Sequence, residues 1–373
     1  MGMRKRDATE KRTVLYRVIY EDLKSKIQSN EFQDGEKLPF ERELCDKFGV
    51  DRVTVRKALE LLVADDLLEK RAGLGSFVKH PGRSQAPDVG SASRNILFVM
   101  YDNANEVGKN PHAFNAQLFF SIEQKCRLKN YSLFYAVLDE QSGLADILNG
   151  NSFAGILFVS YIPRHILEQC VKMGLPAICL NNRYEDMISI VSEDERGAYE
   201  AVKYLQGQGH SRIGILLGKR EYYSTAERYR GYKAAMHDVG LATDPRHVME
   251  GDWTFDGARR AVFAMLDALP PDEVPTAIFC CSDMMAIGAM DALKERDYSI
   301  PKSISVMGFD NIQQAEYIYP RLTTVSTEVQ HMVELAVDKI ISFNAGAANP
   351  VSRGYVIQIP SVLKIRQSVA ALP

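Results

Sequence analysis

Residues 35–59 read GEKLPFERELCDKFGVDRVTVRKAL, a pattern that predicts two short helices separated by a turn. Gly49 breaks the first helix, because glycine readily takes up the left-handed conformation that ends helices. Asp51 is a good N-cap for the second, because its carboxylate accepts hydrogen bonds from the free N–H groups of a first turn. We therefore predict helices at residues 41–48 and at about 52–65.

The flanking residues complete a small domain. Four apolar residues recur at every fourth position and predict a helix that ends near residues 29–30: Leu15, Ile19, Leu23 and Ile27. Residues 68–71 and 76–79 read as two short β segments joined by a glycine-containing turn. Three helices followed by such a hairpin predict a winged helix-turn-helix, in which one helix enters the major groove of DNA.

The outward face of the second motif helix is basic. Arg52 and Arg56 lie four residues apart, so both point the same way. An arginine donates two hydrogen bonds to guanine O6 and N7, worth about 1–3 kcal/mol of discrimination. Arg42, Thr54 and Lys57 are better placed for phosphates. The alternative is a solvated helix face without a partner, which is the usual situation for charges on a helix.

The combined motif resembles the DNA-binding domain of the gluconate-repressor (GntR) family along its whole length, including the segment GLGSFV at residues 73–78. The resemblance implies operator DNA as a partner, with contacts at Arg42, Arg52, Thr54, Arg56 and the wing residue Gly73. Phe40 and Asp51 depart from the family, which has Ser at the first position and Ser or Thr at the second. The charge of Asp51 would be repelled by a phosphate that a hydroxyl would bind.

A segment rich in Pro, Gly and Ser follows the hairpin and has no apolar period, as expected of a linker. We predict a DNA-binding domain over residues 10–80, a linker over 81–93 and a body over 94–373. The chain of 373 residues is 46% hydrophobic, enough for more than one core. It has neither an apolar run long enough for a membrane span nor a signal peptide, so we expect a cytoplasmic protein.

The body alternates apolar strands with amphipathic helices. The strands are expected at residues 96–100, 132–137, 155–159 and 177–180 and, after the pattern restarts, at 212–217, 277–281 and 305–308. Strands that are apolar throughout predict parallel sheets covered by helices on both faces. Two successive units predict an α/β body with two lobes, and ligands bind at the carboxyl ends of such strands.

Polar and aromatic side chains lie just beyond several of these strands. Arg183, Asp283 and Asp310 each follow a strand, Trp253 follows a short turn, and Arg228 lies near the start of a helix. Carboxylates and arginines form paired hydrogen bonds with neighbouring hydroxyls, and an aromatic face covers the C–H side of a sugar ring. The set therefore favours a polyol site.

Each residue of this set also has a structural interpretation. Asp283 could cap the helix at 284–295, Asp310 could hold a turn, Trp253 could belong to the core, and Arg228 could pair with Glu227 or Asp252. Their convergence at strand ends favours the pocket.

The body resembles the sensor domain of the lactose/galactose-repressor (LacI) family, itself similar to periplasmic sugar-binding proteins, over roughly residues 94–368. The stretches that carry the resemblance are residues 209–213, 228–232, 275–279, 282–288, 306–310 and 322–325. It places effector contacts at Asn115, Arg183, Asp194, Arg228, Trp253, Asp283 and Asp310. It also implies a homodimer formed through the helix at 114–128. Ser282, Asp194 and Thr327 depart from the family pattern, which leaves the particular sugar open.

Together these features predict a ligand-responsive bacterial transcription repressor of the arabinose-repressor type. It would bind palindromic operator DNA as a homodimer and change its DNA affinity when a sugar or sugar derivative fills the cleft. Whether the effector is phosphorylated, and whether it releases or tightens DNA binding, stays open.

An enzyme is the competing class. The sequence contains no Ser-His-Asp elbow, phosphate loop or metal-ligand spacing, so we predict no enzyme activity, no cofactor and no metal site. The alternative is a GntR head on an aminotransferase-like body, which would need a Schiff-base lysine and a different order of strands.

Overall fold

The computed structural model describes residues 3–28, 31–32, 36–65, 67–71, 75–78, 93–101, 113–345 and 354–372. The chain divides into two compact units, Met1–Pro87 and Asp88–Pro373. Among the described helices, none combines the length and the apolar character that a membrane span requires.

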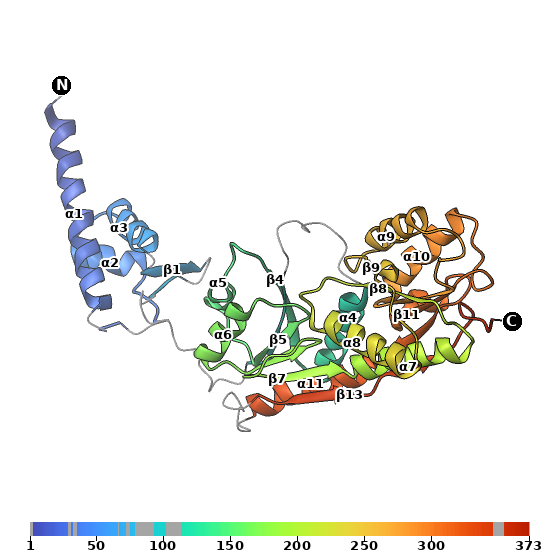
Figure 1. Cartoon of the computed structure of the whole chain (residues 1–373). Coiled ribbons are helices and arrows are strands. Elements are labelled where there is room, and N and C mark those ends of the chain that lie inside the picture. Colours follow the sequence, from blue (N-terminus) through green and yellow to red (C-terminus); the bar gives the residue numbers. More distant parts are fainter. Residues whose placement is uncertain are drawn as a thin grey trace. The chain divides into compact units, whose positions relative to one another are not determined.

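The described part of the N-terminal unit consists of helices and one hairpin (Figure 1). The elements are α1 (Met3–Gln28), α2 (Glu41–Phe48), α3 (Arg52–Ala64), β1 (Leu68–Arg71) and β2 (Gly75–Val78), the two strands being antiparallel. Asp51 caps α3 as predicted, with its Oδ1 accepting the Thr54 N–H at 2.8 Å. Gly49 ends α2 in the left-handed region, with φ of 63°.

Helix α1 packs its apolar stripe on α3. Ile19, Leu23 and Ile27 are buried in one cluster with Leu59. Leu15, predicted for the same stripe, is instead 43% exposed. Tyr16, the next residue, is partly buried and packs against this cluster.

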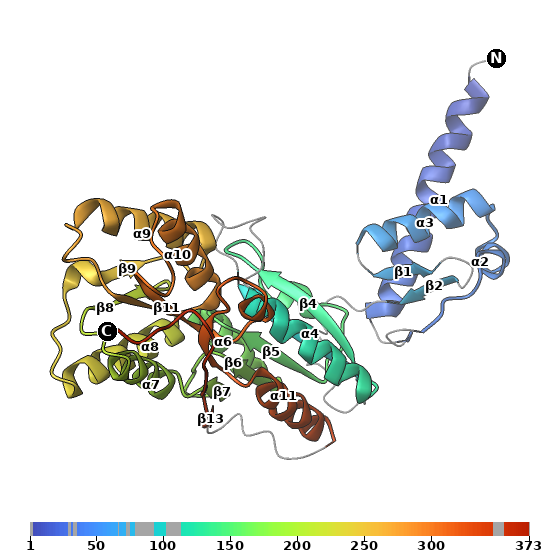
Figure 2. The same cartoon turned by 90° about the vertical axis from the view of Figure 1, so that its right-hand side faces the viewer.

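The C-terminal unit has two lobes, each built on a six-stranded sheet (Figures 1 and 2). The first lobe has the order β13-β7-β6-β5-β3-β4, and the second has β14-β12-β11-β10-β8-β9. The first sheet contains β3 (Asn95–Tyr101), β4 (Ser132–Leu138), β5 (Gly155–Val159), β6 (Ala177–Leu180), β7 (Ile188–Ser192) and β13 (Val356–Ile359). The second contains β8 (Ile213–Leu217), β9 (Val248–Glu250), β10 (Ala277–Cys280), β11 (Ser305–Asp310), β12 (Thr323–Ser326) and β14 (Val362–Lys364). The pairing is parallel except between β12 and β14.

Helices cover both faces of each sheet. In the first lobe, α4 (Ala113–Leu128) and α11 (Val329–Asn344) lie side by side on one face (Figure 2), and α5 (Leu144–Leu148) and α6 (Arg164–Met173) lie on the other. In the second, α7 (Asp194–Gly207) packs beside α8 (Tyr223–Asp238), and α9 (Phe255–Ala268) packs beside α10 (Asp283–Glu295) across the sheet. This cover explains why β5 and β8 are apolar and buried throughout.

The described chain passes between the two lobes at three places: from β7 to α7, from β12 to α11, and from β13 to β14. The prediction of two successive units was therefore incomplete. After β12 the chain returns to the first lobe with α11 and β13 before β14 joins the second sheet. A sequence pattern orders strands along the chain but does not say which sheet each one joins.

Candidate functional site

A cavity lies between the two lobes, where the carboxyl ends of the sheets face each other. The first lobe contributes the start of α4 and the residues that follow β5 and β6. The second contributes the start of α8 and the residues after β9, β10 and β11. The lining residues are Ala113, Phe114, Asn115, Ser160, Asn181, Tyr222, Ser224, Arg228, Trp253, Ser282, Met284, Asp310 and Ile312.

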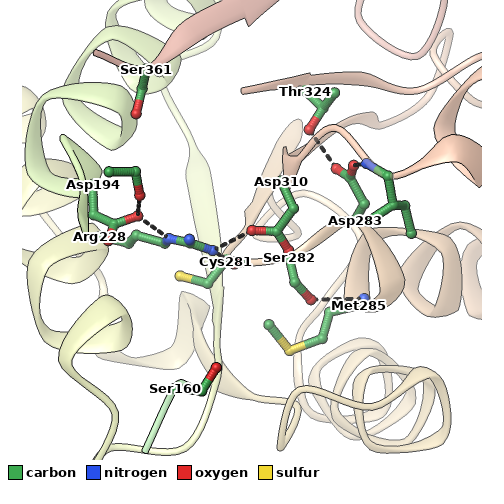
Figure 3. Close-up of polar contacts among 12 residues, drawn as sticks. Ser160, Asp194, Arg228, Cys281, Ser282, Asp283, Met285, Asp310, Thr324 and Ser361 are labelled. Atoms are coloured by element: carbon green, nitrogen blue, oxygen red, sulfur yellow. Dashed lines mark hydrogen bonds and ion pairs between the residues drawn. The ribbon is translucent and has the colours of Figure 1, made fainter. Parts of the chain in front are cut away.

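Arg228 is the charged centre of this cavity and is almost fully buried (Figure 3). Its Nε donates to Asp194 Oδ1 at 2.8 Å, and its Nη1 donates to Asp310 Oδ1 at 3.1 Å and to the carbonyl of Cys281. The guanidinium carbon lies 3.7 Å from the centroid of the Phe309 ring. Burial alone would lower the pKa of Arg228, but the two carboxylates outweigh it and raise that pKa, so the side chain stays charged.

Asp283 at the start of α10 and Asp310 at the end of β11 have different surroundings (Figure 3). Asp310 lines the cavity, and burial raises its pKa to about 7 although the Arg228 guanidinium opposes the change. Asp283 is completely buried and accepts hydrogen bonds from the Ile312 N–H at 2.8 Å and from the Thr324 hydroxyl. Its burial raises the pKa of Asp283 well above the usual value. Asp283 therefore stands behind the cavity wall and fixes the loop that carries Ile312.

Some buried polar atoms around the cavity have no hydrogen-bond partner among the described residues. They include Trp253 Nε1, Asn181 Oδ1 and Asp194 Oδ2. A buried polar atom without a partner costs about 1–3 kcal/mol, so such atoms are usually satisfied by water or by a ligand. Trp253 Nε1 and Asn181 Oδ1 belong to residues that line the cavity, and this donor and acceptor suit a molecule that carries hydroxyl groups, since a hydroxyl both donates and accepts.

The backbone around the cavity is strained at several residues that line it. The φ angles are 59° at Ser160, 54° at Asn181, 63° at Trp253 and 109° at Asp310, all in or near the left-handed region. Such conformations cost roughly 1–3 kcal/mol each for residues other than glycine, and they cluster at ligand sites. With the backbone in these conformations, the four residues line the cavity.

The structure brings together most of the predicted effector residues. Asn115, Arg228, Trp253 and Asp310 line the cavity, and Asp194 holds Arg228. Arg183 is exposed and does not line the cavity, and Asp283 lies behind the wall. The described partners of Arg228 are neither Glu227 nor Asp252, and Ser282 rather than Asp283 caps α10 by accepting the Met285 N–H at 3.2 Å.

Sequence reasoning missed Ser160, Asn181 and Tyr222, which also line the cavity. Ser160 and Asn181 directly follow β5 and β6, so the rule that found Asp310 could have found them. Ser160 Oγ donates to Asn115 Oδ1 at 2.9 Å. Tyr222 precedes α8, and its ring centroid lies 5.8 Å from that of Trp253, a contact that leaves no signal in the sequence.

In the N-terminal unit, α2 and α3 expose four of the basic side chains that the sequence singled out. Arg42, Arg52, Arg56 and Lys57 are exposed, with the Lys57 ammonium 4.5 Å from the centroid of the Tyr16 ring. Thr54 is buried, and its hydroxyl donates to Asp51 Oδ1 at 2.8 Å, so it does not share the exposed face of the arginines. Gly73 lies outside the described residues.

Two family models match the chain. Residues 15–78 match the model of bacterial regulatory proteins of the gntR family, and residues 202–369 match the periplasmic binding protein-like domain. The chain joins a GntR-type helix-turn-helix domain to a periplasmic-binding-protein-like sensor domain. Both matches agree with the resemblances inferred from the sequence.

Relatives with the same kind of sensor domain are named as repressors. The chain is 27% identical over 266 residues to the ribose operon repressor of Haemophilus influenzae, covering 69% of this chain and 78% of that protein. It is 29% identical over 265 residues to the probable HTH-type transcriptional repressor ExuR of Bacillus subtilis, covering 70% and 77% of the two chains. It is thus a transcription regulator and not an enzyme.

The sensor domain also has the fold of solved LacI-family structures. A LacI family transcriptional regulator from Enterococcus faecium with bound ribose aligns with a TM-score of 0.64 at 22% identity, covering 75% of this chain and all of that one (100%). This two-lobed fold rules out the aminotransferase-like body that the sequence left as an alternative.

Proposed function

We propose that the regulator is a ligand-responsive repressor in which an uncharged sugar or related polyol, bound in the cavity, changes the affinity of the GntR-type domain for operator DNA. The observation that carries the proposal is the buried group of Arg228, Asp194 and Asp310 at a cavity in a chain that also has a DNA-binding domain. A relative named for the ribose operon and a similar structure with bound ribose support a sugar as the effector. Because bacterial operators lie in the cytoplasm, the proposal also places the protein there.

The chemistry of the cavity favours an uncharged, hydroxyl-rich ligand. Asp310 would accept hydrogen bonds from ligand hydroxyls. Asn181 Oδ1 would accept one more and Trp253 Nε1 would donate one, since neither atom has a partner among the described residues. The rings of Trp253 and Tyr222 offer apolar faces to C–H groups. The Arg228 guanidinium already binds two carboxylates, so a phosphate or carboxylate on the ligand would meet two negative charges for one positive charge.

We propose two roles for the exposed basic side chains of the DNA-binding domain, base reading and phosphate contact. We assign base reading to Arg52 and Arg56, because a helix of this type enters the major groove with its first turns. We assign phosphate contacts to Arg42, Lys57 and the wing residue Gly73. Thr54 would have to turn its hydroxyl away from Asp51 to contribute to DNA binding.

Exposed apolar side chains of the first lobe support the proposal of a homodimer. Helix α4 buries Leu118 and Ile122, but Phe120 and Leu128 are 67% and 75% exposed. Strand β4 is the edge strand of its sheet and exposes Tyr135. Apolar side chains gathered on a surface mark protein interfaces. A two-fold dimer would present two DNA-binding domains to a palindromic operator.

The experiment that tests the proposal uses the full-length protein. DNA is first selected from a random-sequence pool, and the selected duplex is then titrated with and without pentoses, hexoses, sugar acids and sugar phosphates. We expect an enriched palindrome and a change in operator affinity of roughly 5- to 150-fold with an uncharged sugar. The direction of the change gives the sign of the coupling. Enrichment without a response to any compound would overturn the effector assignment, and no enrichment would overturn the DNA-binding assignment.

A further inference from the structure

Glu41, the first residue of α2, binds both arginines to which we assign base reading. Its Oε2 accepts Arg52 Nε at 2.7 Å and Arg56 Nη2 at 3.1 Å, and its Oε1 accepts Arg56 Nε at 3.3 Å. The Glu41 side chain is 23% exposed, against 71% for Arg52 and 53% for Arg56. The carboxylate is therefore the less exposed partner, and both arginines project past it towards solvent.

Two contacts hold in place the start of the helix that carries Glu41. Helix α2 starts at Glu41 because the Phe40 N–H donates to Glu43 Oε2 at 2.7 Å in a capping interaction. Leu44, one turn later, is buried in the same core as Val55 of α3. Glu41 thus lies at the start of a helix that is packed against α3, the helix that carries the arginines. Anchored in this way, an arginine loses less rotamer freedom when it binds an outside partner.

The edge of the guanidinium that Glu41 occupies determines what the arginine can recognise. In Arg52 the bond uses Nε, and its two Nη groups have no partner among the described residues. Paired N–H groups match O6 and N7 of guanine, an acceptor pair with fixed geometry. A phosphate has no such requirement and accepts from a mobile arginine equally well. Because the Glu41 charge also repels phosphates, it weakens indiscriminate binding more than base reading.

We propose that Glu41 is a positioning residue that gives Arg52 and Arg56 their sequence specificity for operator DNA. The inference rests on the proposed function, because it presumes that this surface binds DNA. The competing interpretation is a surface ion pair of no consequence, which many exposed pairs are. The two interpretations differ in what the loss of the carboxylate does to the ratio of specific to non-specific binding.

The test compares the full-length protein with Glu41→Gln, which keeps the size of the side chain and removes its charge. The matched control is Glu60→Gln, which removes one exposed charge from α3 near Arg56 without breaking a hydrogen bond to it. For each protein the Kd is measured, at one salt concentration, for the duplex that the wild type selects and for a random duplex. The DNA selection is then repeated with Glu41→Gln.

We expect Glu41→Gln to lower the ratio of the random-duplex Kd to the selected-duplex Kd about tenfold, with unchanged or tighter binding of the random duplex. Its selected pool should lose guanine preference at one or two positions of each half-site. Glu60→Gln should keep the ratio within about twofold. A wild-type ratio and an unchanged selected sequence for Glu41→Gln would overturn the inference.

Unfolding of the Glu41→Gln variant and failure of the wild type to select DNA would have different meanings. If Glu41→Gln unfolds the N-terminal domain, Glu41→Asp replaces it, because it keeps the charge at the helix start but is too short to hold both arginines. A wild-type ratio for a folded Glu41→Asp would likewise overturn the inference. If the wild-type protein selects no sequence at all, the proposed function fails rather than the role of Glu41.

Discussion

Asp194 Oδ1 accepts a hydrogen bond from Arg228 Nε at 2.8 Å, and the same oxygen accepts one from Ser192 Oγ at 2.8 Å. Ser192 ends β7 in the first lobe, and Asp194 begins α7 in the second, so the pair sits at a passage of the chain between lobes. Since Arg228 also lines the cavity, one buried ion pair connects the site to the segment that would bend if the lobes moved. This arrangement gives a physical route from effector binding to a change in lobe geometry.

Arg228→Met should destabilise the sensor domain strongly. The change leaves two carboxylates without their shared cation, and removing one partner of a buried pair costs about 3–5 kcal/mol. Arg230→Met on the same helix removes pairs of an exposed arginine with the exposed Glu195 and the half-buried Glu227, and it should cost much less than the loss of Arg228. Urea unfolding followed by the emission of Trp253 measures both variants. Equal losses in the two variants would contradict a special role for Arg228.

Effector affinity should fall as the pH drops below about 7. Burial raises the pKa of Asp310 to about 7, and the charged carboxylate accepts a hydrogen bond from a ligand hydroxyl more strongly than the protonated group does. Below this pKa the proton must first leave, which weakens binding up to about tenfold per pH unit. Titrations of Trp253 emission with the effector between about pH 5.5 and 8.5 check this expectation. Asp310→Asn should bind more weakly but without the pH slope.

The stability of the sensor domain should respond to Asp310 in the opposite sense. Its folded pKa is raised above the ordinary value of 3.8, so between about pH 4 and 7 the folded state holds a proton that the unfolded chain has lost. Its contribution to the free energy of unfolding is therefore largest at the acid end and falls as the pH rises through this window. Comparing the slope of stability against pH in the wild type and in Asp310→Asn isolates this contribution. A steeper decrease in the variant would show that another group controls the slope.

Gly218→Ala should abolish effector binding while leaving operator recognition intact. Gly218 directly follows β8, and any Cβ there would collide with the indole of Trp253. The ring would have to leave the cavity wall. Gly207→Ala is the matched control, because an added Cβ there meets nothing within 4 Å. Calorimetric titration with the effector should show no binding for the first variant and wild-type affinity for the second.

The sequence was most informative where a local rule acts alone. The bounds of β5 and β6 and the cap at Asp51 were predicted correctly, because an apolar run or a cap depends on neighbouring residues. Asp194 and Arg228 were both named as effector residues, but their pairing could not be predicted because it joins helices 34 residues apart. The chain path through α11 and β13 was missed for the same reason.

Asp283 shows how packing decides between equivalent candidates. Asp283 and Asp310 each come just after a predicted strand, and both were predicted to face the ligand. Gly308 of β11 leaves the space that the Asp283 carboxylate fills, since a Cβ at that residue would collide with it. The side chain therefore turns towards Thr324 and away from the cavity. A glycine on a neighbouring strand, far away in the sequence, thus sets the direction of the aspartate.

Arg52→Ala combined with Arg56→Ala should abolish specific operator binding, because both side chains to which we assign base reading are lost. A loss of at least about 30-fold is expected, since each good pair with guanine is worth about 1–3 kcal/mol. The Kd of the effector should stay unchanged, because the cavity lies wholly within the C-terminal unit. Arg230→Ala, which removes an exposed arginine from the sensor domain, controls for the loss of positive charge. Simultaneous loss of effector binding in the double variant would indicate misfolding or an error in the proposed division into domains. Retained operator binding would leave the basic face of α3 as a solvated helix surface.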